Sequence, residues 1–200
     1  IQEVNAAASG GSIGFSGVTS ITGSSLPKIS KPVVIEGALA GGGRVELKGG
    51  SSEDNHFTLV ITGGSSTLTG LSLPLGVMLK TGGQNVVSDC FFGTDVTGTI
   101  ARLGNGLLIE DSADNMVLGN LLSGISTFHT SGALAIRGPF ATGNVVKGNF
   151  IGTDPTGTTL LSNGTNSAGI FIKDASDNVI GGTDDGDANV IVSGTGIVIN

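Results

Sequence analysis

The hydrophobic residues of this chain fall into very short runs that recur along the sequence. A run of three or four residues rich in Val, Ile and Leu ends in a polar residue, and turn-forming Gly, Asn, Asp, Ser or Thr follow. Runs this short, bounded by such residues, are typical of β-strands and predict an all-β chain. The run occurs at residues 33–36, 59–62, 77–80, 107–110, 134–137, 170–173 and 197–200.

A second recurring element follows the later runs and begins at Asn85, Asn115, Asn144 and Asn178. It holds two short strands around one polar pair, so each unit of 18 to 36 residues contains about three strands. A meander of antiparallel hairpins gives no reason for the same flanking residues to recur. Stacked parallel coils do, because equivalent positions then lie about 4.8 Å apart. The pattern predicts a single-stranded parallel β-helix of about six to seven coils.

The composition narrows the class further. Of 200 residues, 36 are glycine and 38% are apolar, which excludes a disordered chain. The net charge is −7 and the nine Lys and Arg are scattered, so we expect no nucleic-acid partner. No apolar stretch approaches the roughly 18 residues that span a bilayer, so we expect no membrane insertion. We expect one β-helix domain over residues 1–200.

The repeat resembles a known architecture. The pattern Gly-(Val/Ile/Leu)-x-Ile followed by Asn-x-Val-x-Gly-Asn-x-Ile-x-Gly resembles the repeat of right-handed parallel β-helices of the pectate-lyase-like superfamily. Residues 148–183 look like repeats in large secreted or surface proteins of environmental bacteria. The resemblance implies a right-handed coil and a secreted or cell-surface location in bacteria. Because that superfamily includes lyases, hydrolases, adhesins and inert spacers, it does not fix an activity.

The two ends of the chain carry different expectations. The start also resembles this group, in which a short helix caps the first coil, and Ile1, Val4, Ala7 and Ala8 have the spacing of such a helix. We therefore expect a capping helix over residues 1–10 and coils over 11–200. Because the last strand stops in mid-coil, we expect this end to pair end to end with another chain or to continue into further coils.

Several recurring polar residues are interpreted as structural. Asn85, Asn115, Asn144 and Asn178 each begin a strand after a turn, where an asparagine suits a sharp corner and its amide can bond the next coil. A sequence duplication, NVVSDCFFGTDVTGT at residues 85–99 and NVVKGNFIGTDPTGT at 144–158, places Asp95 and Asp154 in two long loops, 93–105 and 152–168. We expect both aspartates to form turns, and the loops to leave the same side about 9.6 Å apart.

A column of charged residues is the weak candidate for catalysis. If the coils stack in register, Lys80, Glu110, Arg137 and Lys173 form an outward column, with Glu110 between two cations. Lyases of the superfamily that the chain resembles keep a proton-abstracting Arg or Lys on such a face, and calcium held by acidic residues assists it. The simpler interpretation is that alternating charges keep the face soluble.

Calcium and other ligands have only weak candidates. Asp184, Asp185 and Asp187 form an acidic segment of oxygen ligands without the spacing of a known calcium loop, and we expect no cofactor, with calcium the weak alternative. Further candidates are given a structural or solvent-exposed interpretation: Asp111, Asp114, Asp174 and Asp177 as turn residues, His56 and His129 in loops, a buried Cys90, the Thr-Gly-Thr segments 97–99 and 156–158, and an isolated glycosylation motif at Asn163.

These features predict a non-catalytic extracellular module that acts as a rigid stalk, spacer, adhesin or filament subunit. The chain has no Trp or Tyr to stack on sugar rings, and its acidic residues form no complete catalytic motif. The alternative is a polysaccharide lyase or glycoside hydrolase that uses the charged column. Expected partners are other copies of the chain and a polysaccharide or another cell-surface ligand.

Overall fold

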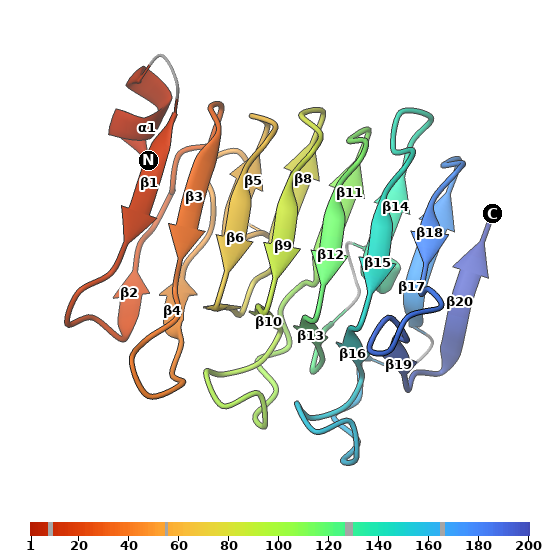
Figure 1. Ribbon diagram of the computed structural model, residues 1–200. Helices are drawn as coiled ribbons and strands as arrows, with labels where there is room; N and C mark the ends of the chain where they lie inside the picture. Colours follow the sequence, from red (N-terminus) through yellow and green to blue (C-terminus); the bar gives the residue numbers. More distant parts are fainter. Residues whose placement is uncertain (8–9, 55, 127–129, 165–166) are drawn as a thin grey trace.

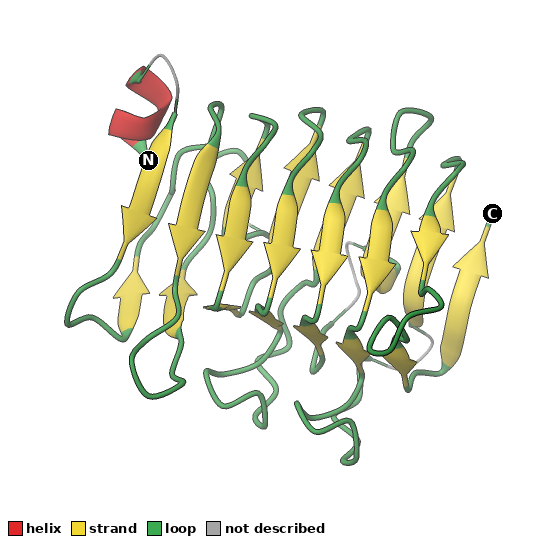
Figure 2. Ribbon diagram, in the orientation of Figure 1, coloured by secondary structure: helices red, strands yellow, loops and turns green. Residues whose placement is uncertain are grey.

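The computed structural model describes residues 1–7, 10–54, 56–126, 130–164 and 167–200. In this part of the chain, short strands wind into a parallel β-helix with three sheets (Figure 1). Every strand pair within the sheets is parallel, and only short loops and one helix interrupt the coil (Figure 2).

Each coil contributes one strand to each sheet, except that the first coil has no strand in sheet 3. Sheet 1 contains β1 (Gly11–Gly14), β3 (Val33–Glu36), β6 (Thr67–Thr69), β9 (Val86–Ser88), β12 (Met116–Leu118), β15 (Val145–Lys147) and β18 (Val179–Ile180). Sheet 2 contains β2 (Ser20–Thr22), β4 (Val45–Lys48), β7 (Leu71–Leu73), β10 (Phe91–Phe92), β13 (Leu121–Leu122), β16 (Phe150–Ile151) and β19 (Val190–Ile191). Sheet 3 contains β5 (Leu59–Ile61), β8 (Val77–Lys80), β11 (Leu107–Glu110), β14 (Gly132–Arg137), β17 (Ala168–Lys173) and β20 (Thr195–Ile199).

The coil is right-handed. In Figure 1 the chain descends along sheet 1, which faces the viewer, and climbs along sheet 3 behind it while it advances from the N-terminal to the C-terminal end. This is the hand that parallel crossovers adopt because of strand twist. The predicted parallel β-helix is therefore confirmed, and its strands define seven successive turns of sheet 1 and sheet 2 in the described residues.

The interior is filled by one side of every strand. In β11, Leu107 and Ile109 point into the core and are fully buried, while Leu108 points outward. Because the coils are in register, Ile109 lies beside Leu79 of β8 and Ile136 of β14, so identical positions form apolar columns along the axis. The alternation within each four-residue run is what places these side chains.

The run at residues 33–36 lies in a different sheet from the six later runs that share its pattern. Residues 33–36 share the short apolar pattern of sheet 3, but β3 lies in sheet 1 between β1 and β6. In the first coil the position beside β5 is held by Ile29, which pairs with Ile61. The alternation of a four-residue strand reports which side is buried, and it carries no information about which of three similar sheets the strand joins.

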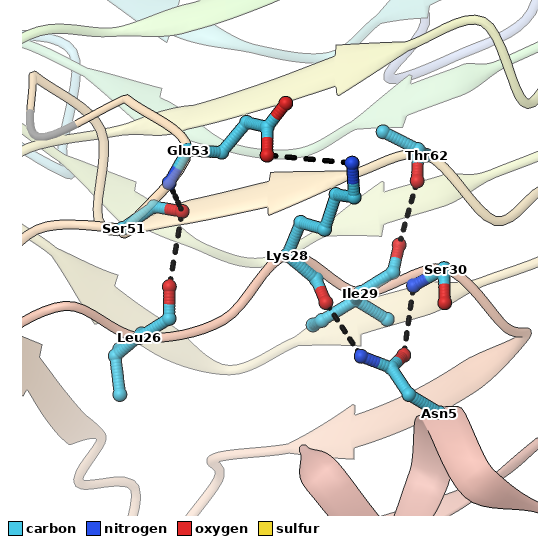
Figure 3. Close-up of polar contacts among 8 residues, drawn as sticks. All are labelled: Asn5, Leu26, Lys28, Ile29, Ser30, Ser51, Glu53 and Thr62. Atoms are coloured by element: carbon cyan, nitrogen blue, oxygen red, sulfur yellow. Dashed lines mark hydrogen bonds and ion pairs between the residues drawn. The ribbon is translucent and has the colours of Figure 1, made fainter.

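The N-terminal helix is shorter than the ten residues expected. Helix α1 spans Gln2–Ala6, and its Asn5 is held by the first coil (Figure 3). The Asn5 Nδ2 donates to the Lys28 carbonyl at 2.6 Å, and its Oδ1 accepts from the Ser30 N–H at 2.8 Å. Ile1 packs against the core, whereas Ala8 and the side chain of Val4 lie outside the described part. No helix in the described ranges is long and apolar enough to cross a membrane.

Side chains fasten the first coil to the second. The Leu26 carbonyl accepts from the Ser51 hydroxyl at 3.1 Å, and the Lys28 ammonium lies 3.4 Å from the Glu53 carboxylate (Figure 3). The Ile29 carbonyl accepts from the Thr62 hydroxyl at 3.4 Å. These bonds satisfy backbone groups where the first coil has no regular third strand.

Buried or partly buried asparagines connect four coils at the corner before sheet 1. In this first asparagine ladder, the Asn115 Oδ1 accepts from both the N–H and the Nδ2 of Asn85, at 3.0 and 2.8 Å. Asn144 does the same for Asn115 at 2.9 and 2.7 Å, and Asn178 for Asn144 at 2.9 and 2.9 Å. Each amide thus satisfies polar groups that no β-strand bonds reach.

A second asparagine ladder, not foreseen from the sequence, follows the corner between sheets 1 and 2. The Asn149 Oδ1 accepts from the N–H and Nδ2 of Asn120 at 2.9 and 3.0 Å. Asn189 repeats the pattern with Asn149 at 3.0 and 2.8 Å. Cys90 occupies the equivalent position one coil earlier, and its N–H donates to the Asn120 Oδ1 at 2.9 Å. Cys90 precedes β10 and is completely buried, and burial raises the pKa of its thiol to about 12.

We predict that Asn144→Ala lowers the free energy of unfolding by about 2–5 kcal/mol, because it leaves two buried donors of Asn115 without an acceptor. Urea unfolding followed by circular dichroism measures the change. Asn200→Ala removes an exposed asparagine and should stay within about 0.5 kcal/mol of the parent chain. Equal effects of the two substitutions would contradict a structural role for the ladder.

We predict that Cys90→Asn raises the free energy of unfolding by about 1 kcal/mol, because it extends the second ladder. The thiol lies beside the backbone N–H of Leu71, where an amide oxygen would accept as Asn120 does from Cys90. Thermal unfolding compares this variant with Cys90→Ser, whose shorter side chain should destabilise. If the asparagine variant were the less stable of the two, the ladder geometry described for this position would be wrong.

Candidate functional site

The four charged candidates lie side by side on sheet 3. Glu110 pairs in register with Lys80 on one side and Arg137 on the other, and Arg137 pairs with Lys173. The Lys80 Nζ lies 3.0 Å from the Glu110 Oε2, and both side chains are partly exposed. The Arg137 Nε is buried and, within the described part of the chain, without a hydrogen-bond partner.

An apolar strip covers the outer face of sheet 3 beside this column. It consists of side chains that point away from the core and pack on one another: Phe57, Val60, Met78, Leu108 and Ala135, with Phe171 partly buried against them. The charged column therefore lies beside a face of sheet 3 on which apolar side chains pack against one another.

One of the three aspartates in the acidic segment near the C-terminus forms an ion pair. The Asp187 Oδ2 lies 2.8 Å from the Lys147 Nζ, while Asp184 and Asp185 are exposed. The hydrogen bond between the two side chains lowers the pKa of Asp187 and raises the pKa of Lys147. The ranges that the structure describes hold no group of three or more His, Cys, Asp or Glu arranged to bind a metal.

The remaining candidates lie in turns and loops. Asp111, Asp114, Asp174 and Asp177 all have φ between +47° and +58°, a conformation that aspartate tolerates in turns. The His56 Nδ1 lies 2.7 Å from the Asp54 Oδ1. His129 lies outside the described residues.

Asn163 is buried inside the fold. Its Oδ1 accepts from the Ile125 N–H at 3.0 Å, and its Nδ2 donates to the Leu122 carbonyl at 3.0 Å. With both ends of its amide engaged, the side chain is inaccessible as a glycosylation acceptor in the folded chain.

The duplicated sequence forms two matching hairpin loops on one side of the coil (Figure 1). In the first hairpin loop (94–101) the Asp95 Oδ1 accepts from the N–H of Thr99 at 3.2 Å and of Ile100 at 3.1 Å. In the second hairpin loop (153–160) the Asp154 Oδ1 accepts from the N–H of Thr158 and Thr159, each at 3.1 Å. The strands that precede the loops, β10 and β16, are separated by β13 alone, two strand spacings of about 4.8 Å.

The hairpin loops fold back over the outer face of sheet 2. A Cβ on Gly98 would lie 2.5 Å from Pro155 of the other loop and 2.8 Å from Phe91 and Leu121, so only glycine permits this approach. A Cβ on Gly157 would likewise lie 2.6 Å from the Phe150 ring. The duplication thus builds a roof over an outward apolar stripe, which explains why Phe91 is buried although it faces away from the core.

A groove opens beside this roof, at residues that sequence reasoning did not single out. Arg44 lies 3.7 Å over the centre of the Phe91 ring and forms an ion pair with Asp89. Glu46, two residues further along β4, faces the same side, and its Oε2 lies 2.9 Å from the Lys48 Nζ. The signal in the sequence is the alternation of charged and apolar residues in RVELK, which puts three charges on one outer face.

The groove has a volume of about 620 Å³. The groove is lined by Ser20 and Glu46 of sheet 2, by the glycines 41–43, and by Val96, Thr97 and Pro155 of the hairpin loops. Past Arg44 and Phe91 a smaller hollow continues along the axis to Phe150. The lining of the groove thus combines the buried carboxylate of Glu46 with apolar side chains.

The chain was compared with known proteins. No protein-family model, curated protein or solved structure matches it.

We predict that the second hairpin loop loosens only when the pH falls below 3.8, the ordinary pKa of an aspartate. The hydrogen bond from the Thr159 N–H is the largest cause that holds the pKa of Asp154 below 3.8. The ionised Asp154 carboxylate therefore stabilises the loop fully above pH 3.8. This stabilisation is lost as the pH falls through the lowered pKa of Asp154. The amide NMR shifts of Thr158 and Thr159 should titrate together below pH 3.8.

Asp154→Asn provides the control, since the same amides should then show no such titration. A midpoint at or above pH 3.8 in the parent chain would contradict the hydrogen-bonded turn.

Proposed function

We propose that this chain is a non-catalytic extracellular module, a rigid spacer or adhesive stalk segment of a bacterial surface protein. The observation that carries the proposal is the pair of asparagine ladders, whose bonds run from coil to coil along the axis through buried amides. A solenoid whose coils are tied together in this way suits a load along its axis. The extracellular bacterial location rests on the resemblance of the repeats to surface proteins.

A relationship to the pectate-lyase-like superfamily belongs to the same proposal. It is supported by the right-handed coil, the three parallel sheets and the Gly-x-x-Ile and Asn-x-Val repeats. The superfamily contains both enzymes and structural modules, so the relationship is compatible with either function.

We propose that the C-terminal end of the coil associates with further β-structure. β18, β19 and β20 each pair with one neighbour only, which leaves a free strand edge in every sheet. Val179, Ile197 and Ile199 are exposed there by 49%, 45% and 73%. Free edges with exposed apolar side chains favour pairing with further β-structure, and we propose that this is either a second copy of this chain or further coils of the same protein.

A polysaccharide lyase or glycoside hydrolase is the second candidate. The observation that favours it is Arg137, whose Nε is buried without a partner in the described residues and which lies beside the exposed Lys173. The apolar strip next to the column argues against it, because a polysaccharide would need that face to be open. We propose no resident cofactor for the module, and calcium enters only with this second candidate.

Incubation with acidic and neutral polysaccharides, with and without calcium, tests the choice. We expect no polysaccharide cleavage above a blank, measured as new reducing ends and as the ultraviolet absorbance of unsaturated products. Binding of a polysaccharide without cleavage would support an adhesive module.

Product that forms with the parent chain and disappears in Arg137→Ala would overturn the structural function. Lys31→Ala, which removes another cation from a different part of the coil, is the matched control and should leave any such activity unchanged.

A further inference from the structure

The coil that contains β9, β10 and β11 departs from the repeat at two adjacent positions. The next two coils have Gly-Asn at the corner between sheets 1 and 2, as Gly119-Asn120 and Gly148-Asn149, whereas this coil has Asp89-Cys90. Gly119 and Gly148 have φ of +61° and +67°, and Asp89 adopts φ of +50° in the same place. Cys90 thus replaces one asparagine of the second ladder. Asp89 puts a side chain at a positive-φ position where glycine fits best.

The carboxylate introduced by this departure fixes the position of Arg44. Asp89 pairs with the guanidinium, which is thereby held flat over the Phe91 ring. Arg44 belongs to an earlier coil and stands 45 residues away in sequence, so the pair also connects separate coils. The local departure therefore builds one wall of the groove.

Two charged side chains at this wall are only half satisfied. The Glu46 side chain is 8% exposed, and its Oε1 is buried without a hydrogen-bond partner in the described residues, although Lys48 engages the other oxygen. The Arg44 Nε is buried and unpartnered in the same part of the chain, although Asp89 engages another guanidinium nitrogen. A buried carboxylate oxygen or guanidinium N–H without a partner is costly, so the pair marks a place prepared for a ligand.

We propose that this groove binds a small zwitterion of the α-amino-acid class with an apolar side chain. The ligand ammonium group donates to the Glu46 Oε1, and the ligand carboxylate accepts from the Arg44 Nε. Residues 44 and 46 are two apart on one face, so the two open groups suit a ligand that carries an ammonium group and a carboxylate on the same carbon. Leu39, Val96 and Pro155 line the groove and offer contacts to an aliphatic side chain.

Other ligand classes fit the groove less well. An anion would meet the Glu46 carboxylate, and a cation would meet Arg44, so each would leave one open group unsatisfied. A saccharide stacks best on an exposed aromatic face, but the Phe91 ring is covered by Arg44. The site lies on the outer face of sheet 2, away from the charged column on sheet 3, and its function does not depend on the scaffold function proposed above.

Isothermal titration calorimetry with L-leucine as the probe tests the proposal. We expect leucine to bind the parent chain, N-acetyl-L-leucine (which lacks the ammonium charge) to bind at least about tenfold more weakly, and L-leucinamide (which lacks the carboxylate) to be weakened similarly. Glu46→Gln should weaken leucine by about tenfold or more and leave N-acetyl-L-leucine little changed. Arg44→Met should likewise weaken leucine binding by about tenfold or more and leave the binding of L-leucinamide little changed.

Glu36→Gln on β3 removes an exposed carboxylate from another sheet and should not change leucine affinity. Because Arg44→Met could loosen Phe91, the nearly isosteric Glu46→Gln variant decides the outcome, after its thermal unfolding is shown to match that of the parent. Absence of leucine binding at millimolar concentrations, or equal affinity in Glu46→Gln, would overturn the proposal. Binding of maltotriose in place of leucine would assign the groove to saccharides and also overturn it.

Discussion

Parallel stacking of coils in register is the constraint on which the rest of this structure depends. Strands of two to six residues cannot be stable alone, and each gains its hydrogen bonds and its apolar contacts only from the coils before and after it. At the corners, where the strands end, the chain must still satisfy buried backbone N–H groups. Asparagine solves this problem because one amide oxygen accepts two bonds from the coil before, as Asn144 does from Asn115.

The same constraint separates scaffold from specialised surface. A residue that repeats in every coil serves the stack, whereas a residue that breaks the repeat must be explained by something outside it. The duplicated hairpin loops belong to the scaffold, because their aspartates bond their own turns and their glycines lie over Phe91 and Phe150. Asp89 breaks the repeat, and its side chain points to Arg44 and the groove. Departures from periodicity therefore locate the candidate site better than periodicity does.

The sequence predicts much of the fold because the alternation of apolar and polar residues within each run is visible directly. The first asparagine ladder is also foreseeable, since its members recur before Val-Val, Met-Val or Val-Ile pairs. The sheet that contains residues 33–36 is not foreseeable, because three similar sheets share one pattern. The second ladder is hidden by Cys90 at one end and by the acidic neighbours of Asn189 at the other. The groove depends on Arg44 meeting Asp89 across 45 residues, a contact that no local pattern encodes.

Hydrogen exchange at the corner amides tests most directly whether the asparagines hold the coils together. The N–H groups of Asn85, Asn115 and Asn120 lie outside the strands and donate to side-chain oxygens of the next coil. If these bonds unite the stack, NMR-detected exchange should give these amides the same protection as the central strand amides of sheet 3, because all open only when the coil unfolds. Fast exchange at the corners alongside protected strands would contradict the account.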